Sequence, residues 1–203
     1  MRRSRFDRLG GLFKRHGHRV YPRWVRDVYG IFIASLRRGA RVLDLGGGTG
    51  LLATWARQSR CDLELWVVDP SDGMLAHVNE GIRTVRARAE ELPFEDSYFD
   101  AVVVGEALHH FAQPYRALDE ITRVLRLFGR VWLYDYDPRP VAGKVVRILE
   151  RLWGEPGNFL PPDTLRRAFL ERGYRASYDL EGFRYVLVAE LREKASGKSS
   201  PKE

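Results

Sequence analysis

The sequence predicts an α/β fold in which a seven-stranded, mostly parallel sheet lies between two layers of helices, and three observations predict it. Strand-like and helix-like segments alternate along the chain, as they do when helical crossovers join parallel strands. A glycine-rich turn over residues 46–50 separates the first strand from a helix. The last two strands are only four residues apart, and so short a connection forces an antiparallel pair. We therefore expect a parallel sheet that ends in an antiparallel hairpin.

The chain begins its pattern with a helix, a strand and a second helix. A helix is expected over residues 22–38, because Pro22 suits a first helical turn, Gly39 can end the helix and apolar residues recur at helical spacing. Residues 41–45 form the first strand, and residues 51–58 form the helix that follows the glycine-rich turn.

Three further strands follow. Residues 63–68 form the second strand, after which Pro70 and Ser71 can begin a short helix, and residues 83–87 form the third. Residues 99–104 form the fourth strand. Its run of three valines is typical of a strand buried on both faces of a parallel sheet.

The second half of the chain supplies the remaining helices and the hairpin. Apolar residues recur at helical spacing over residues 115–127, and a glycine then turns the chain into a fifth strand over residues 130–134. Two more helices and the two hairpin strands follow, over residues 141–153, 163–172, 175–180 and 185–191.

The composition excludes several classes of protein. With 44% hydrophobic and 30% charged residues over 203 positions, the chain is neither disordered nor of low complexity, and its length suits one globular domain. The longest strongly apolar stretch without a charge, residues 29–36, is far shorter than the ~20 residues that cross a bilayer. The single cysteine, Cys61, excludes an internal disulfide and a cysteine-based metal cluster. We expect a cytoplasmic protein.

Positive charge is concentrated at the start of the chain. Residues 1–39 contain eleven Lys and Arg and two Asp, a net charge of +9, whereas the whole chain carries +7, so residues 40–203 sum to −2. We expect a basic helical lid over residues 1–39, a main domain over residues 40–193 and a frayed tail over residues 194–203. The basic residues are nearly all Arg, and Asn, Gln, Cys and Met are scarce. That profile is compatible with a thermophile, or with genome base composition alone.

The segment over residues 42–50 is the most informative. A buried strand leads through glycines into a helix, so the backbone can approach a ligand closely with the helix N–H groups facing it. Asp69 ends the next strand 19 residues after Gly50, where a carboxylate can accept hydrogen bonds from both hydroxyls of a ribose. Together they predict a nucleoside site rather than a bare turn. Gly48, Gly50 and Ala53 also fit the dinucleotide fingerprint, so the glycines alone leave a nicotinamide cofactor open.

The sequence of residues 44–50, DLGGGTG, resembles the D-x-G-x-G-x-G signature of class I S-adenosylmethionine-dependent methyltransferases. Further segments resemble the same family in the same order: AEELPF with SYFD (89–94 and 97–100), EALHHF (106–111) and LDEITRVLR with GR (118–126 and 129–130). The resemblance covers about residues 40–135 and is greatest to the small-molecule methyltransferases of ubiquinone and menaquinone biosynthesis. It implies a Rossmann-like three-layer α/β/α fold, the strand order 3-2-1-4-5-7-6 and S-adenosylmethionine as the cofactor.

Carried over position by position, the resemblance implies contacts to the methionine and ribose parts of the cofactor. Gly46, Gly48 and Gly50 would shape the floor under the methionine part. Asp44 would help to place that part, and Asp69 would hold the ribose hydroxyls.

A second set of residues would surround the adenine and the methionine end. Met74 would pack on the adenine, although a methionine at helical spacing is also ordinary core. The position before Ala89, often Asp in the family, is Arg88 here, and an arginine cannot accept a hydrogen bond from the adenine amino group. Adenine recognition would then rest on Ala89 or Glu90. Glu106 would lie near the methionine end, just past the fourth strand.

Methyl transfer demands little of side chains, because holding an acceptor in line with an activated methyl group supplies much of the acceleration. A base is needed only if the acceptor must lose a proton. His109 and His110 follow the fourth strand at the expected mouth of the site, and we prefer His110 as the base, with an ordinary helix-start histidine as the alternative. Adjacent histidines face apart on a helix, which argues against a metal site. Residues 134–136 end the fifth strand at the same rim and could bind the acceptor or serve packing.

Residues 1–39 are the expected determinant of the acceptor. If residues 1–20 are helical, they carry an apolar stripe beside many arginines, formed by Phe6, Leu9, Leu12 and Phe13. Such a helix could cover the cofactor pocket, touch an anionic membrane surface or follow an RNA phosphate backbone. Tyr21 or Tyr29 would reach the cofactor from such a lid.

The sequence therefore predicts an S-adenosylmethionine-dependent methyltransferase that transfers a methyl group to a small molecule by in-line displacement. One alternative is an RNA methyltransferase, which the +9 leading segment favours. Another is a nicotinamide-dependent oxidoreductase. A third is a non-enzymatic binding protein that has kept the fold, for which Arg88 would be the sign of a degraded pocket. The oligomeric state and the acceptor atom stay open.

Overall fold

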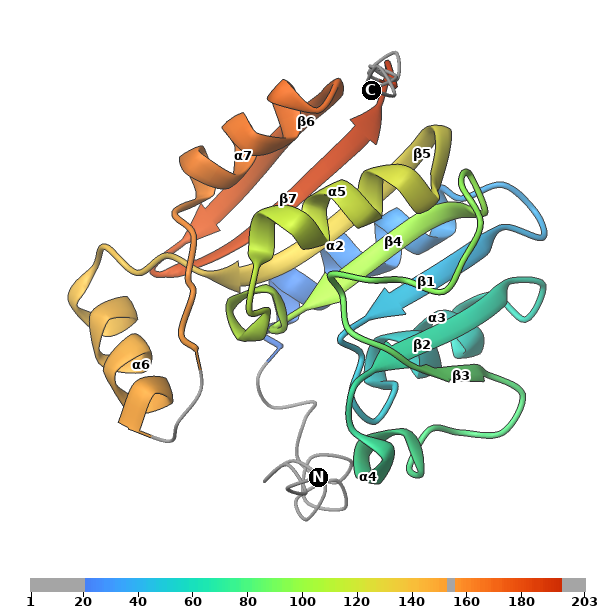
Figure 1. Cartoon of the computed structure of the whole chain (residues 1–203), viewed down its shortest axis with the longest axis horizontal. Coiled ribbons are helices and arrows are strands. Elements are labelled where there is room, and N and C mark those ends of the chain that lie inside the picture. The colour runs from blue at the N-terminus through green and yellow to red at the C-terminus, as the bar shows by residue number, and fades with distance from the viewer. Residues whose placement is uncertain (1–20, 153–155, 195–203) are drawn as a thin grey trace, which may run out of the picture.

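A seven-stranded sheet in the order β3-β2-β1-β4-β5-β7-β6 organises the computed structural model, which describes residues 21–152 and 156–194 (Figure 1). The neighbouring pairs among β1 to β5 are parallel, and β7 pairs antiparallel with both β5 and β6. The strands are β1 (Arg41–Leu45), β2 (Glu64–Asp69), β3 (Arg83–Arg86), β4 (Phe99–Gly105), β5 (Leu125–Tyr136), β6 (Tyr174–Glu181) and β7 (Arg184–Leu191). The predicted fold class and strand order are confirmed.

Helices cover both faces of this sheet (Figure 1). One face carries α2 (Arg23–Ala34) and α3 (Leu51–Ser59), and the other carries α5 (Pro114–Val124) and α7 (Pro162–Glu171). Three further helical segments each follow a strand: α4 (Asp72–Leu75) after β2, the 3-10 turn η2 (Leu108–His110) after β4, and α6 (Val141–Leu152) after β5.

Each face of the sheet has its own hydrophobic core, and the valines of β4 divide between the two. Val102 and Val104 pack with α5 and α7, whereas Val103 packs with α2 and α3. All three side chains are fully buried. The prediction that this strand is buried on both faces is therefore confirmed, and its rigid placement fixes the loop that follows it.

Two predicted helix ends are wrong. The first helix ends at Ala34 rather than at residue 38, because the Ser35 hydroxyl donates to the Phe32 carbonyl (2.6 Å) and the chain then turns toward β1. The helix predicted over residues 115–127 ends at Val124, because Leu125 adopts an extended backbone and pairs with Phe99 of β4. The helical spacing of apolar residues thus continues in the sequence beyond Val124, although the backbone from Leu125 onward belongs to the sheet.

The described part of the basic leading segment packs in the core of the main domain. Val25, Tyr29, Phe32 and Ile33 of α2 are buried against the sheet and α3. The expected domain boundary at residue 39 therefore falls between two elements of one packed unit. Residues 1–20 of the lid expected over residues 1–39, and residues 195–203 of the tail expected over residues 194–203, lie outside the described residues. In the part of the chain that the structure describes, no helix is long and apolar enough to span a bilayer.

Candidate functional site

Most of the predicted site residues come together at the carboxyl ends of β1, β2 and β4. β1 runs into the glycine loop of residues 46–50, β2 ends at Asp69, and β4 ends at Gly105, just before Glu106. Because these strands are parallel neighbours, their carboxyl ends meet at one edge of the sheet, where open α/β folds bind ligands.

The glycine loop is packed so tightly that side chains are excluded at two of its positions. A Cβ on Gly46 would lie 2.6 Å from the Cβ of Ala107, and the backbone φ there is +67°. A Cβ on Gly47 would lie 2.6 Å from the carboxyl carbon of Asp44. The loop is held to β2, since the N–H groups of Gly46 and Gly47 donate to the carbonyl of Val68 at 2.8 and 3.2 Å. At these two positions the loop therefore consists of backbone alone.

Asp44 is a buried acid, and only one of its two carboxyl oxygens has a hydrogen-bond partner among the described residues. Its Oδ2 accepts a hydrogen bond from the Ala53 N–H of α3 at 3.0 Å, whereas its Oδ1 has no hydrogen-bond partner among the described residues. Burial, together with the nearby charge of Asp69, raises the pKa of Asp44 to about 7. A buried oxygen without a partner calls for a donor or a cation from outside the chain.

Asp69 connects the end of β2 to the glycine loop. Its Oδ2 accepts from the Gly48 N–H at 3.0 Å, and its Oδ1 accepts from the Ser71 N–H at 2.9 Å. A carboxylate can accept several hydrogen bonds, and Asp69 thereby joins the glycine loop to the start of α4. Ser71 caps α4 by accepting from the Met74 N–H at 3.1 Å, and Met74 is buried beneath the loop at Gly48.

A pocket opens beside the glycine loop, and four predicted residues line it: Gly46, Ala89, Glu90 and His110. Gly46 lines it from the loop side, and Arg88 lies at its edge. The other lining residues are Leu45, Val68, Pro70, Ala87, Phe111 and Ala112. The pocket therefore joins the ends of β1, β2 and β3 to the turn after β4.

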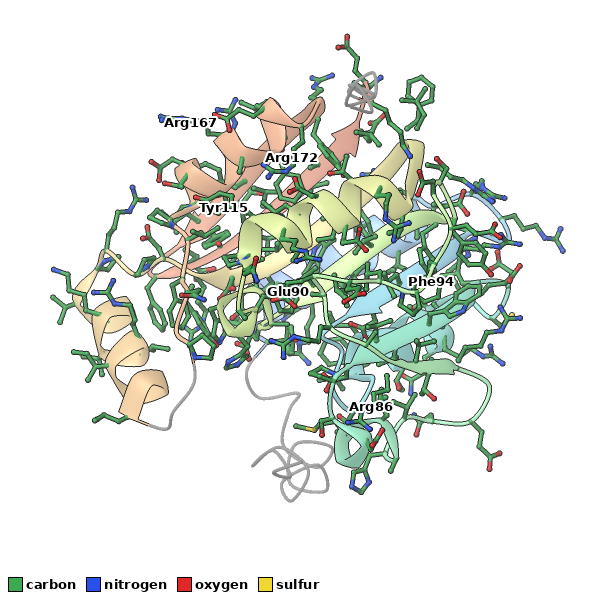
Figure 2. The ribbon with its side chains drawn as sticks, viewed as in Figure 1. Arg86, Glu90, Phe94, Tyr115, Arg167 and Arg172 are labelled. Atoms are coloured by element: carbon green, nitrogen blue, oxygen red, sulfur yellow. The ribbon has the colours of Figure 1, made fainter. Side chains whose placement is uncertain are left out.

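The buried carboxylate of Glu90 is already engaged. Figure 2 shows Glu90 near the start of α5, where its Oε1 accepts from the Gln113 N–H at 3.0 Å. The exposed Arg88 side chain lies alongside, with its Nε 3.6 Å from the Glu90 Oε2. Arg88 is thus paired with a neighbouring acid, and both residues line the pocket.

Glu106 occupies a strained, half-buried position just after β4. Its φ of +52° is unusual for a residue other than glycine. Burial raises the pKa of Glu106 to about 8, and the Tyr136 hydroxyl at the end of β5 donates a hydrogen bond to its Oε1. Burial also raises the pKa of Tyr136, which keeps that hydroxyl in its donating form.

The two neighbouring histidines have different environments. His109 is buried, its Nδ1 lies 2.7 Å from the Asp135 Oδ1, and its ring stacks on Phe159 with centroids 4.2 Å apart. Its backbone N–H also contacts the other Asp135 oxygen at 3.2 Å. His110 instead lines the pocket. A carboxylate-oriented histidine and a pocket-lining histidine thus stand side by side, with ring centroids 4.0 Å apart.

Tyr21, rather than Tyr29, lies beside the site. The Tyr21 hydroxyl lies against Gly105, where a Cβ would overlap it, and its ring packs 5.3 Å from that of Tyr134. Burial, followed by the charges of Glu106 and Asp44, raises the pKa of Tyr21. Tyr29 instead donates its hydroxyl to the Leu52 carbonyl at 2.7 Å and so ties α2 to α3.

Sequence reasoning missed two functional features of this edge. It assigned no role to Phe111, although the ring lines the pocket and lies 3.2 Å from a Cβ built on Gly46. It also gave no partner to His109, because Asp135 lies 26 residues away and only the pairing of β4 with β5 brings the two together. Among the described residues, no group of three side chains could hold a metal ion.

The fold and this edge define a class of protein: an open α/β fold with a glycine loop after its first strand and an acid at the end of its second strand, an arrangement with which folds of this kind bind nucleoside-containing ligands. Residues 43–133 match the family described as "Methyltransferase domain". The chain belongs to the class I S-adenosylmethionine-dependent methyltransferases.

Relatives and solved structures agree with this assignment. The chain is 28% identical to the ubiquinone/menaquinone biosynthesis C-methyltransferase UbiE of Idiomarina loihiensis, over 94% of this chain and 79% of that protein. It is 33% identical to UbiE of Proteus mirabilis, but over 72% of this chain and only 60% of that protein. A solved S-adenosylmethionine-dependent methyltransferase from Thermotoga maritima shares the fold, with a TM-score of 0.72 and 19% identity over 92% of this chain and 98% of that one.

Proposed function

We propose that this methyltransferase binds S-adenosylmethionine across the glycine loop and transfers its methyl group to a small-molecule acceptor. The observation that carries the proposal is the hydrogen bond from the Gly48 N–H to Asp69, which places an acid at the end of β2 next to the glycine loop. A turn that only connected β1 to α3 would not need an acid bonded to it, nor glycines at positions where a side chain has no room.

The adenosine half of the cofactor fits the pocket beside the loop. Asp69 would accept hydrogen bonds from the ribose hydroxyls, and the backbone of Ala89 would meet the adenine edge. Glu90 is engaged with Gln113, so its carboxylate would contribute mainly by holding this segment in place. Because Arg88 is turned to Glu90, its presence in the family's acidic position leaves the pocket open. Met74 would support the loop from below.

The methionine half would lie over Gly46, Gly48 and Gly50, with Asp44 beneath. The Asp44 Oδ1 is the buried oxygen that lacks a partner, and the ammonium group or the sulfonium would supply the missing positive charge. Glu106 would stand at the same end, held by Tyr136. When bound, S-adenosylmethionine supplies an activated methyl group, so the protein's task is to align an acceptor with it and exclude water.

A proton acceptor is present if the acceptor molecule must lose a proton. His110 lines the pocket and is the side chain with direct access, as the sequence suggested. His109 is held by Asp135, which fixes the orientation of its ring. Within the described residues, these two histidines are the candidate bases at this edge, and the experiments below separate them.

The acceptor is proposed to be a small molecule. Only α6, α7 and their connections stand between β5 and β6, so no large acceptor domain is inserted in this part of the chain. The relatives act in ubiquinone and menaquinone biosynthesis as C-methyltransferases. Because the chain spans 79% and 60% of those two relatives, a quinone-like aromatic acceptor is a proposal for the acceptor screen and not an assignment.

Residues 1–20 are proposed to cover the acceptor. Tyr21, which follows this segment in the sequence, lies against Gly105 and near Glu106 and Asp44. An RNA acceptor finds no support among the relatives, although the charge of +9 over residues 1–39 keeps it as an arm of the screen. A cytoplasmic location and a thermophilic source stay predictions from composition, to be tested by fractionation and by the thermal midpoint.

The proposal is tested by calorimetric titration of the full chain with S-adenosylhomocysteine, with NAD as the parallel ligand. We expect micromolar binding of the first ligand and none of the second. Binding of NAD in competition with S-adenosylhomocysteine would overturn the proposed cofactor. If neither ligand binds at millimolar concentration, the protein has kept the fold but does not bind the cofactor.

A further inference from the structure

Helix α6 carries an apolar stripe that none of the described residues covers. Four large apolar side chains on it are exposed to solvent: Val141 (77%), Val145 (49%), Ile148 (55%) and Leu152 (74%). Their spacing of four, three and four residues places them within about 60° of one another around the helix axis. They form one continuous ridge, referred to below as the α6 stripe.

The opposite side of α6 attaches the helix to the body of the protein. Gly143 is buried there, and a Cβ at this position would overlap the carbonyl of Asp137. Asp137 in turn binds Arg139, whose guanidinium also reaches Asp163 at the start of α7 (2.8 Å). These contacts fix the entry into α6, and Figure 1 shows the helix standing beside the carboxyl end of β5, apart from the helical layers. The α6 stripe faces outward because the glycine side faces inward.

The charges next to the α6 stripe are positive. Lys144 is exposed and Arg147 half-buried, and both lie on one flank of the stripe, about 60–120° around the helix. The whole chain carries +7, and residues 1–39 alone carry +9. Pairing of α6 with a second copy of itself, or with residues 1–20, would bring like charges together. An apolar ridge flanked by cations instead suits a surface that is apolar inside and negatively charged outside.

We propose that the α6 stripe docks this protein on an anionic lipid bilayer, with the four apolar side chains among the acyl chains and Lys144 and Arg147 at the headgroups. This inference does not rest on the proposed cofactor or acceptor, because none of the stripe residues lines the candidate site. A 12-residue helix supplies limited apolar area, so binding should be reversible and sensitive to salt.

Flotation of the full chain with vesicles tests the proposal. Vesicles of phosphatidylglycerol mixed with phosphatidylcholine are compared with vesicles of phosphatidylcholine alone, at low and high salt. The double variant Val145→Ser/Ile148→Ser removes the centre of the stripe, and Lys144→Glu/Arg147→Glu reverses its flank. Leu170→Ser/Leu180→Ser is the matched control, because both leucines are exposed but lie on α7 and β6.

We expect binding to the anionic vesicles only, weakened by salt and reduced at least about tenfold by either α6 double variant, with the control unchanged. Absence of binding, or binding that the Val145→Ser/Ile148→Ser variant retains, would overturn the proposal. Stripe-dependent dimerisation in sedimentation, without vesicle binding, would assign the stripe to a second copy and also overturn it. Titration with S-adenosylhomocysteine on the same samples reports separately on folding and on the cofactor proposal.

Discussion

The carboxylate of Asp69 accepts hydrogen bonds from the N–H groups of Gly48 and Ser71, at 3.0 and 2.9 Å. This one side chain at the end of β2 therefore holds both the glycine loop and the residue that caps α4. In the proposed complex, the same carboxylate would also accept hydrogen bonds from the ribose hydroxyls. The bond between Asp69 and Gly48 therefore joins the shape of the proposed site to its chemistry.

Replacing this acid should weaken the cofactor complex. We expect Asp69→Ala to lower the affinity for S-adenosylhomocysteine by about 1–3 kcal/mol, because the ribose hydroxyls and the Gly48 N–H lose their acceptor. Calorimetric titration measures the change, with circular dichroism as the folding check. Asp72→Ala is the control, since Asp72 is exposed and pairs with Arg86 away from the loop. Equal affinity of Asp69→Ala and wild type would remove Asp69 from the site.

The crowding at Gly46 gives a second prediction. Gly46 and Gly182 have similar backbone φ values, +67° and +62°, but a Cβ on Gly46 would meet Ala107, whereas nothing lies near a Cβ on Gly182. We expect Gly182→Ala to cost about 1 kcal/mol of unfolding free energy from backbone strain alone. Gly46→Ala should cost about 2–4 kcal/mol, because steric overlap is added, and it should abolish binding of S-adenosylhomocysteine. Urea unfolding compares the two, and similar costs would contradict the described packing of the loop.

Glu106 should make stability depend on pH. Burial raises its pKa to about 8 from the usual 4.5, so the folded protein holds a proton that the unfolded chain releases. The stabilising contribution is fully present below about pH 4.5 and is lost as the pH rises through about 8. Glu106→Gln, which stays neutral, should match wild type near pH 5 and exceed its unfolding free energy by about 1–3 kcal/mol near pH 8.5.

Urea unfolding at the two pH values measures this difference. Glu95→Gln is the control, because Glu95 is an exposed carboxyl. A difference between Glu106→Gln and wild type that does not change with pH would show that Glu106 is ionised in the folded protein throughout this range.

The contact between His109 and Asp135 allows a test of which histidine removes a proton from the acceptor. If His109 is the base, Asp135→Asn should lower turnover roughly tenfold to a hundredfold, because an amide cannot stabilise a charged imidazole as a carboxylate does. The pH dependence of turnover should shift in the same variant, while the affinity for S-adenosylhomocysteine stays unchanged. If His110 is the base, His110→Gln should produce the larger loss. Full activity in both variants would mean that the acceptor reacts without either histidine.

Deletion of residues 1–20 tests the proposed cover. The truncated chain keeps Tyr21 and the buried face of α2, so we expect its circular dichroism and its affinity for S-adenosylhomocysteine to match those of the full chain. Turnover of the acceptor should fall, because the proposed cover is missing. A truncated protein that is fully active on the acceptor would rule out this role.

The sequence by itself determined the elements whose signals are local. The alternation of strands and helices, the valines of β4, the glycine loop and the short hairpin connection each follow from the preferences of neighbouring residues. The sheet type and the meeting of the loop with Asp69 followed from them, because parallel strands end at the same edge. The position of the proposed nucleoside site could therefore be predicted before any contact was known.

The tertiary structure decided what depends on backbone pairing and burial. Leu125 belongs to a strand and not to the helix, because its backbone pairs with Phe99 of β4, 26 residues away in the sequence. His109 became the oriented histidine because Asp135 faces it from β5, and Tyr21 reached the site because α2 packs against the sheet. The raised pKa of Glu106 likewise comes from burial. Such properties depend on the free energy of groups that meet only in the folded chain, and local sequence patterns do not encode that energy.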